Sequence, residues 1–189
     1  MRSPDAFIVQ PLNDTRYDNI REMGDVEFIV SSSQEDHRFS NRYAIVEATP
    51  ISYTGPISKG DTLLVHHNVF KYYYDMKGVQ KSGRSYFKDQ LFFIEEDQFF
   101  LYKKDDQWKA HSKYCFVKPV EEKESWIKKF VKEEPLFGTL RYGNEQLERL
   151  GVKEGDEISF TPQSEYEFTV DGEKLYRMYT ENITMVLWI

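Results

Sequence analysis

The chain of 189 residues carries 32 acidic and 25 basic side chains, which gives it a formal net charge of −7. Because such a chain repels polyanions overall and has no block of basic residues, we expect neither nucleic acid nor an anionic membrane as a partner. Hydrophobic residues make up 40% of the sequence, which is enough for a buried core and excludes a disordered protein.

The single cysteine, Cys115, excludes an intramolecular disulfide and a four-cysteine metal site. The first ten residues lack the apolar stretch of a signal peptide, and no run approaches the roughly 20 apolar residues of a membrane span. These features predict a cytoplasmic protein.

Ten short apolar runs, separated by turn residues, predict strands and therefore an all-β fold. In chain order they are residues 6–12, 43–48, 61–67, 91–95, 99–103, 114–120, 138–142, 157–161, 166–170 and 184–189. Two brief helices are also predicted, one capped by Ser125 over residues 125–131 and one over residues 144–151 that ends at a glycine.

Three short blocks of the first half recur in the same order in the second half, which indicates an internal repeat. The first block, residues 7–12, recurs at 115–120, an offset of 108 positions. Both copies are apolar strands that contain a proline near their end, where no ladder hydrogen bond is required from its nitrogen.

The second block, residues 57–65, recurs at 152–160, an offset of 95 positions. In both copies a Gly-Asp pair, which ends at Asp61 and at Asp156, precedes an apolar strand. Glycine provides a backbone conformation with positive φ, and aspartate hydrogen-bonds the local backbone, so each pair predicts a tight turn.

The third block, residues 97–102, is aligned with 172–177 at an offset of 75 positions. The falling offsets predict two enlarged loops in the first copy, with 13 and 20 additional residues. The second insertion, near residues 75–90, is rich in Gly, Lys and Ser and predicts an exposed excursion. The alternative explanation is a chance match of short apolar runs.

The aligned blocks resemble the GroES-type co-chaperonins. The second copy follows the family pattern closely, with FVKP at 116–119, GVKEGDEISF at 151–160 and DGEKLYRMYTENITMVL at 171–187. The first copy follows it more loosely, with FIVQP, SKGDTLLV and FFLYKKDDQWKA. The resemblance implies two tandem GroES-like irregular β-barrels, one over residues 1–112 with a long mobile loop and an inserted loop, the other over 113–189 with a shortened loop.

In that family, a hydrophobic tripeptide in the mobile loop docks on the chaperonin. The corresponding loop of the first copy spans roughly residues 13–42, and the tripeptide Phe28-Ile29-Val30 lies within it between polar flanks. The resemblance therefore implies that Phe28, Ile29 and Val30 bind a GroEL-type chaperonin in its ATP- or ADP-bound state. The alternative is that these residues form a core strand or a lid over the barrel.

The second copy departs from the family pattern, because its equivalent segment, residues 121–136, is shorter and predicted to be helical. We expect one chaperonin-binding loop in the chain. The resemblance also implies a homo-oligomeric ring, in which the second domain either occupies a ring position or decorates the ring.

Other constellations give no support to an enzyme. His66 and His67 are adjacent on a predicted strand, so we expect their side chains on opposite faces and no shared metal. Cys115 lies in a predicted strand, where a buried, inert thiol is expected. No nucleophile elbow, P-loop or dinucleotide fingerprint is present in the sequence, and we expect no cofactor.

Aromatic residues at 70–74 lie beside Lys77, Lys81 and Arg84, a composition that also occurs in proteins that bind single-stranded nucleic acid. The net negative charge of the chain opposes that function. The sequence therefore predicts a co-chaperonin that assists protein folding by binding, without catalysis. The alternative is a structural or assembly protein, such as one from a virus, that uses the same barrel for oligomerisation alone.

Overall fold

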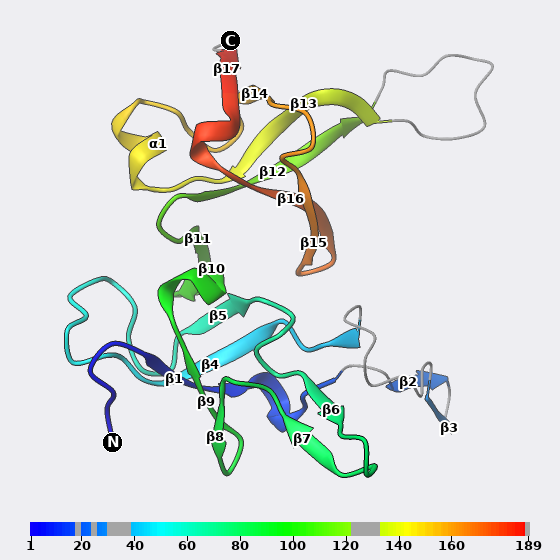
Figure 1. The fold of residues 1–189 in the computed structure, drawn as a ribbon. Helices are drawn as coiled ribbons and strands as arrows, with labels where there is room; N and C mark the ends of the chain where they lie inside the picture. The colour runs from blue at the N-terminus through cyan, green and yellow to red at the C-terminus, as the bar shows by residue number, and fades with distance from the viewer. Residues whose placement is uncertain (18–19, 24–25, 30–38, 122–132, 188–189) are drawn as a thin grey trace. The chain divides into compact units, whose positions relative to one another are not determined.

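The structure, a computed structural model, describes residues 1–17, 20–23, 26–29, 39–121 and 133–187, and the side chains of residues 20–29, 121, 133 and 134 lie outside this description. The chain divides into two compact units, Met1–Gln107 (unit 1) and Trp108–Ile189 (unit 2). The boundary predicted from the sequence lies after residue 112. Each unit is built mainly from antiparallel β-strands, which confirms the all-β class (Figure 1).

Unit 1 contains one large sheet and two small hairpins. The strands of the large sheet are β1 (Phe7–Pro11), β4 (Tyr43–Ala48), β5 (Thr62–Val65), β8 (Tyr86–Lys88), β9 (Leu91–Ile94), β10 (Phe99–Lys104) and β11 (Gln107–Ala110), in the order β11-β10-β5-β4-β1-β9-β8. Only the first residue of β11, Gln107, belongs to unit 1, because unit 2 begins at Trp108. The hairpins are β2 (Ile20–Met23) with β3 (Val26–Ile29), and β6 (Tyr72–Tyr74) with β7 (Gln80–Ser82). Two 3-10 turns are η1 (Leu12–Asp14) and η3 (Glu96–Gln98).

Unit 2 contains one sheet of six strands and a short helix. The strands are β12 (Tyr114–Glu121), β13 (Glu133–Tyr142), β14 (Glu157–Phe160), β15 (Tyr166–Val170), β16 (Glu173–Tyr179) and β17 (Ile183–Leu187), in the order β15-β16-β12-β13-β14-β17. The helix α1 (Glu145–Arg149) begins at Asn144, whose side chain accepts a hydrogen bond from the Leu147 amide, and it lies within the predicted segment 144–151. A 3-10 turn, η4 (Thr180–Asn182), precedes β17.

The two large sheets have the same strand order, which supports the internal repeat. From β10 to β8 the first sheet runs β10-β5-β4-β1-β9-β8, and the second runs β17-β14-β13-β12-β16-β15. Each strand of the second sheet therefore has a counterpart at the same place in the chain and in the first sheet, and among the described strands only β11 lacks one. The pairing among the described strands runs from one open edge to the other, so closure into a barrel stays a prediction.

The Gly-Asp turns of the second block are equivalent in detail. Asp61 accepts a hydrogen bond from the Ser58 amide at 2.8 Å, and Asp156 accepts one from the Lys153 amide at 2.8 Å. The preceding glycines have φ of 94° and 96°, in the region that favours glycine. The predicted tight turn is confirmed in both copies.

The third block is aligned wrongly in the sequence analysis. In the structure η3 is the counterpart of η4, because the Gln98 side chain accepts from the Glu95 amide and the Asn182 side chain accepts from the Tyr179 amide. The true offset between Gln98 and Asn182 is therefore 84 positions rather than 75. Apolar residues occur in both β10 (FFLYKK) and β16 (EKLYRMY), so the alignment matched β10 to β16 instead of to its counterpart β17.

Each of the ten predicted strands overlaps a strand of the structure. The predictions for residues 43–48 and 166–170 are confirmed with the same first and last residues. Seven of the described strands were missed, namely β2, β3, β6, β7, β8, β11 and β16, which lies between β15 and β12. The predicted helix over residues 125–131 lies outside the described residues.

Each unit has its own apolar core. In unit 1, Phe7 of β1 packs edge-to-face against Phe99 and Tyr53, with ring centroids 5.2 and 4.8 Å apart. In unit 2, Cys115 and Val117 of β12 are fully buried among residues of the neighbouring strands. Two separate cores are consistent with two units that fold around their own first strands. No helix among the described residues is long and apolar enough to cross a membrane.

An ion-pair network joins three strands of unit 2. The Glu173 carboxylate of β16 accepts from Lys118 of β12 at 2.8 Å and from the Nε of Arg141 of β13 at 3.0 Å. Arg141 also contacts Glu154. The hydrogen bond from Lys118, followed by the one from Arg141, lowers the pKa of Glu173 below its ordinary value.

Replacement of Asp156 by Ala should lower the free energy of unfolding by about 1 kcal/mol, because the Lys153 amide loses its acceptor. Asp61→Ala should have the same effect in unit 1, and Asp156→Asn, which keeps an acceptor oxygen, should cost less. Urea unfolding measures these changes. Equal stability of Asp156→Ala and the control Glu157→Ala, at an exposed neighbouring position, would contradict the stabilising role of the Asp156 hydrogen bond.

The lowered pKa of Glu173 predicts a pH dependence of stability. The carboxylate stabilises the folded state above its unfolded pKa of about 4.3, and this contribution is lost as the pH falls through the lower folded pKa. Glu173→Gln should therefore be less stable than the wild type at neutral pH, and the difference should shrink at low pH. Thermal unfolding between neutral and acidic pH tests this, and a difference that does not depend on pH would count against the network.

Candidate functional site

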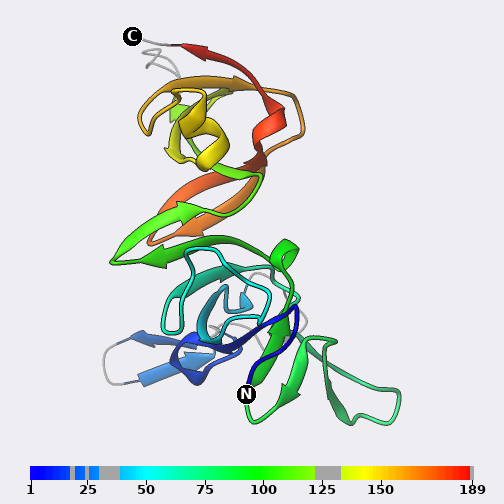
Figure 2. The ribbon, with the colours of Figure 1, turned by 90° about the vertical axis from the view of Figure 1, so that its left-hand side faces the viewer.

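The predicted chaperonin-binding residues lie in the segment that connects β1 to β4. Phe28 and Ile29 belong to β3 and pair with Arg21 and Ile20 of β2. Val30 lies outside the described residues, as do the positions of the Phe28 and Ile29 side chains. Among the described strands, β2 and β3 pair only with each other, so this hairpin is a sheet of its own (Figure 2).

The two ends of this connecting segment meet beside the end of β1 and the start of β4, where they form what we call the root of the arm (residues 12–17 and 39–42). Tyr17 and Ser40 form an isolated antiparallel bridge. The Asn41 side chain donates to the carbonyl oxygens of Leu12 and Thr15 at 2.9 and 2.7 Å. The root is therefore closed by hydrogen bonds before the chain continues into β2.

Arg16 connects the root of the arm to the β6–β7 hairpin. Its two terminal nitrogens donate to the Ser82 hydroxyl of β7 at 3.2 and 3.1 Å. The guanidinium lies over the rings of Tyr72, Tyr86 and Phe92, between 4.8 and 5.4 Å from their centroids. Cation–π attraction holds an arginine among aromatic rings, and burial lowers the pKa of Arg16, although arginine stays charged in proteins.

Tyr17 makes a second connection between the same two segments. The Tyr72 amide donates to the Tyr17 hydroxyl at 3.4 Å, and the two rings pack edge-to-face with centroids 4.9 Å apart. The Gln90 side chain adds a hydrogen bond to the Asp14 carbonyl at 3.3 Å. The two insertions that distinguish unit 1 from unit 2 are therefore attached to each other.

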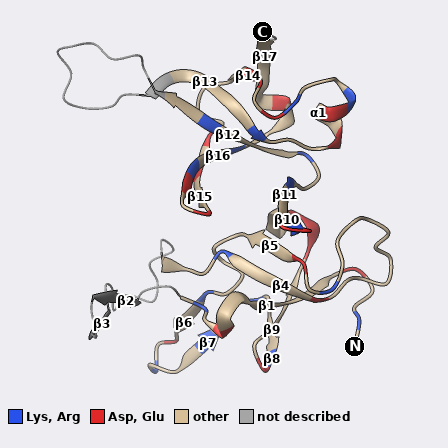
Figure 3. Ribbon diagram, turned by 180° about the vertical axis from the view of Figure 1, so that it is seen from behind, with Lys and Arg blue, Asp and Glu red and all other residues tan. Residues whose placement is uncertain are grey.

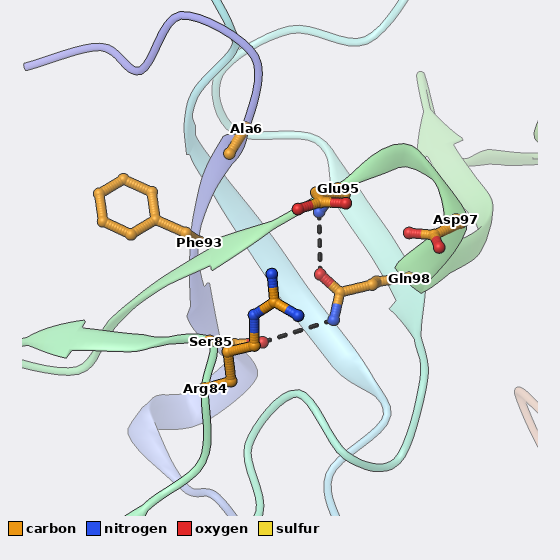
Figure 4. A pocket seen from close by; sticks show the side chains of 7 residues that line it. All are labelled: Ala6, Arg84, Ser85, Phe93, Glu95, Asp97 and Gln98. Carbon is orange, nitrogen blue, oxygen red and sulfur yellow. Dashed lines mark hydrogen bonds between the residues drawn. The ribbon is translucent and has the colours of Figure 1, made fainter.

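A pocket of about 220 Å³ lies elsewhere in unit 1, beside β9 and η3 (Figure 4). Its lining includes Arg84, Glu95, Asp97 and Gln98. The Gln98 amide group is engaged on both sides, because its oxygen accepts from the Glu95 amide and its nitrogen donates to Ser85 at 3.5 Å. These contacts stabilise η3, so the Gln98 side chain in the pocket lining has a structural role.

The histidine prediction is wrong in its geometry. His66 and His67 follow the end of β5, and their rings pack 4.1 Å apart instead of pointing to opposite faces. The alternation of side chains holds only within a strand, and β5 ends at Val65, two residues before the end of the predicted strand. In the part of the chain that the structure describes, no group of three or more His, Cys, Asp or Glu residues could hold a metal ion.

Cys115 is buried in β12, as predicted. Burial raises the pKa of its thiol to about 12, and the thiol lies 3.8 Å from the Met178 carbonyl oxygen. A thiol that stays protonated near neutral pH is a poor nucleophile, so Cys115 has a packing role.

Sequence analysis did not identify Arg16 or Tyr17 as functional residues. Both stand in the polar run NDTRYDN, where nothing predicts contact with aromatic residues more than 50 positions away. The aromatic and basic composition of residues 70–84 was noted, and it marks one half of this contact.

Protein-family models give no match to the chain, and the curated proteins give no significant match. The resemblance to co-chaperonins thus stays a prediction that depends on the quoted motifs.

Arg16→Ala should loosen the β6–β7 hairpin, because it removes two hydrogen bonds to Ser82 and the contacts with three aromatic rings. The loss of such contacts is expected to increase amide exchange in the hairpin about tenfold. Hydrogen exchange of residues 72–83 measures this. The control is Arg84→Ala at an exposed position, and the idea fails if both variants exchange like the wild type.

Proposed function

We propose that the protein is a co-chaperonin, which binds and caps a GroEL-type chaperonin through the arm between β1 and β4 and so assists protein folding without catalysis of its own. The observation that carries this proposal is the β2–β3 hairpin, inserted between the first two paired strands of unit 1. This is the position that the co-chaperonin resemblance assigns to the binding loop.

The physical properties of the hairpin support a role in binding. A two-stranded sheet is only marginally stable in water unless it packs against other structure. Burial of Phe28, Ile29 and Val30 against a partner would contribute about 1.5–3 kcal/mol for each apolar side chain. The ordering cost offsets part of this gain, which suits an interaction that must form and dissociate repeatedly.

The second unit supports one binding arm in each chain. β12 and β13 continue to pair as far as Glu121 and Glu133, so only residues 122–132 connect them. In unit 1 the corresponding connection runs from residue 12 to residue 42. We propose that unit 2 serves assembly into a homo-oligomeric ring, either within the ring or as an addition to it.

An assembly protein without chaperonin binding is the second candidate. It is favoured by the edge strand β17, on which Met185 and Leu187 are exposed and which pairs only with β14 among the described strands. Exposed apolar residues on an open edge are typical of surfaces that pair with another chain. Both candidates require oligomers, and only the first requires a nucleotide-dependent complex with a chaperonin.

Simultaneous replacement of Phe28, Ile29 and Val30 by Ser should abolish binding to a purified GroEL-type chaperonin, because the apolar contact is lost. Binding is measured by pull-down and by biolayer interferometry in the presence of ATP or ADP. The wild type should form a complex that depends on the nucleotide.

The matched control is Ile51→Ser, which removes an apolar side chain that is 63% exposed on another loop of unit 1. This variant should bind like the wild type. No nucleotide-dependent complex of the wild type, or an unchanged affinity of the triple variant, would leave the assembly protein as the better proposal.

A further inference from the structure

The β6–β7 hairpin and the adjacent β8 concentrate exposed apolar side chains. Of the twelve large hydrophobic residues that are exposed in the described part of the chain, six lie between residues 73 and 87, namely Tyr73, Tyr74, Met76, Val79, Tyr86 and Phe87. Met76, at the tip, is fully exposed, and Val79 beside it is 51% exposed. A cluster of this kind is typical of a surface that binds a partner.

The tip of this hairpin is held in one conformation by its own backbone. The Asp75 carboxylate accepts hydrogen bonds from the amides of Lys77 and Val79 at 2.8 and 3.0 Å. The Asp75 amide donates to the Val79 carbonyl at 3.0 Å, and Gly78 has a φ of 73° that favours glycine. Met76 is therefore presented on a preformed turn, which lowers the entropic cost of binding.

The position of the hairpin follows from its attachment to the root of the arm. Arg16 and Tyr17, which immediately precede the β2–β3 segment, contact Ser82 and Tyr72 of the hairpin. The hairpin projects from unit 1 in two views (Figures 1 and 2). The base of the hairpin is therefore fixed to the root of the arm, next to the segment that the proposed partner binds.

The hairpin also differs in charge from the rest of the chain. Residues 71–90 have five basic and two acidic side chains, a net charge of +3, so the remaining residues carry −10 of the total of −7. The basic residues of this segment are Lys71, Lys77, Lys81, Arg84 and Lys88. Figure 3 shows the Lys and Arg positions of the chain in blue. A partner surface complementary to this hairpin has an apolar groove with carboxylates at its rim.

We propose that the β6–β7 hairpin is a second docking element for the protein that the arm binds, with Met76 and Val79 in an apolar groove and Lys77 against acidic residues beside it. This inference rests on the proposed function, because it assigns the hairpin to the same chaperonin partner. Two linked contacts raise the overall affinity through effective concentration, even when each of them is weak.

A single-stranded nucleic acid is the other class of partner that aromatic and basic residues can attract. The chemistry of the tip favours a protein instead. Met76 and Val79 are aliphatic and cannot stack on bases, and the acidic remainder of the chain repels a polyanion.

The test is chaperonin binding by full-length Met76→Ser/Val79→Ser, measured by interferometry in the presence of nucleotide. We expect the affinity to fall about tenfold, because two exposed side chains lose their groove while the fold is unaffected. Lys77→Glu should also weaken binding, and it should reduce the loss of affinity that the wild type shows between 50 and 200 mM salt, about the range in which exposed charges become screened.

Two controls match these changes. Ile51→Ser removes an exposed apolar residue on another loop, and Lys109→Glu reverses an exposed charge elsewhere. Both should bind like the wild type. Circular dichroism spectra should be the same for all variants.

The outcomes separate the two proposals. If the wild type forms no complex, the proposed function fails. If the wild type binds, the Phe28/Ile29/Val30 variant does not, and the hairpin variants bind normally, only the docking role of the hairpin is overturned. It is overturned as well if a labelled single-stranded oligonucleotide binds the wild type and this binding is lost in the Met76→Ser/Val79→Ser variant.

Discussion

The structure depends on one constraint that both units share, which is the pairing of the first strand on both of its edges. β1 lies between β4 and β9, and β12 lies between β13 and β16. The inward residues of these strands, such as Phe7 and Val117, have no exposed surface. Because a slip of one residue would turn them to the other face, the register of the first strand determines the register of its neighbours.

Sequence reasoning identified the elements whose pattern is local. The strands at residues 43–48 and 166–170 alternate or are bounded by turn residues, and the Gly-Asp turns have a chemistry that requires no distant partner. It failed for β16, because the apolar pattern of that strand was assigned to the counterpart of β10. Periodicity identifies a strand but does not say which neighbour it pairs with.

The candidate site was only partly accessible to the same reasoning. The tripeptide Phe28-Ile29-Val30 was found through a motif, and no described contact tests its role. The cluster around Arg16 was missed, because it joins residues from four segments that become neighbours only when the sheet forms. Contacts between distant segments leave no local signal in a single sequence, whereas turns and caps do.

The different connections between equivalent strands have a consequence for how such a protein diversifies. β14 reaches β15 through residues 161–165, whereas β5 reaches β8 through residues 66–85, yet the strand order is the same. The strand order of the sheet therefore does not depend on the length of this connection. After a duplication, one copy can keep the short connection while the other gains a longer one that carries a new binding surface. The sheet on which folding depends stays the same in both copies.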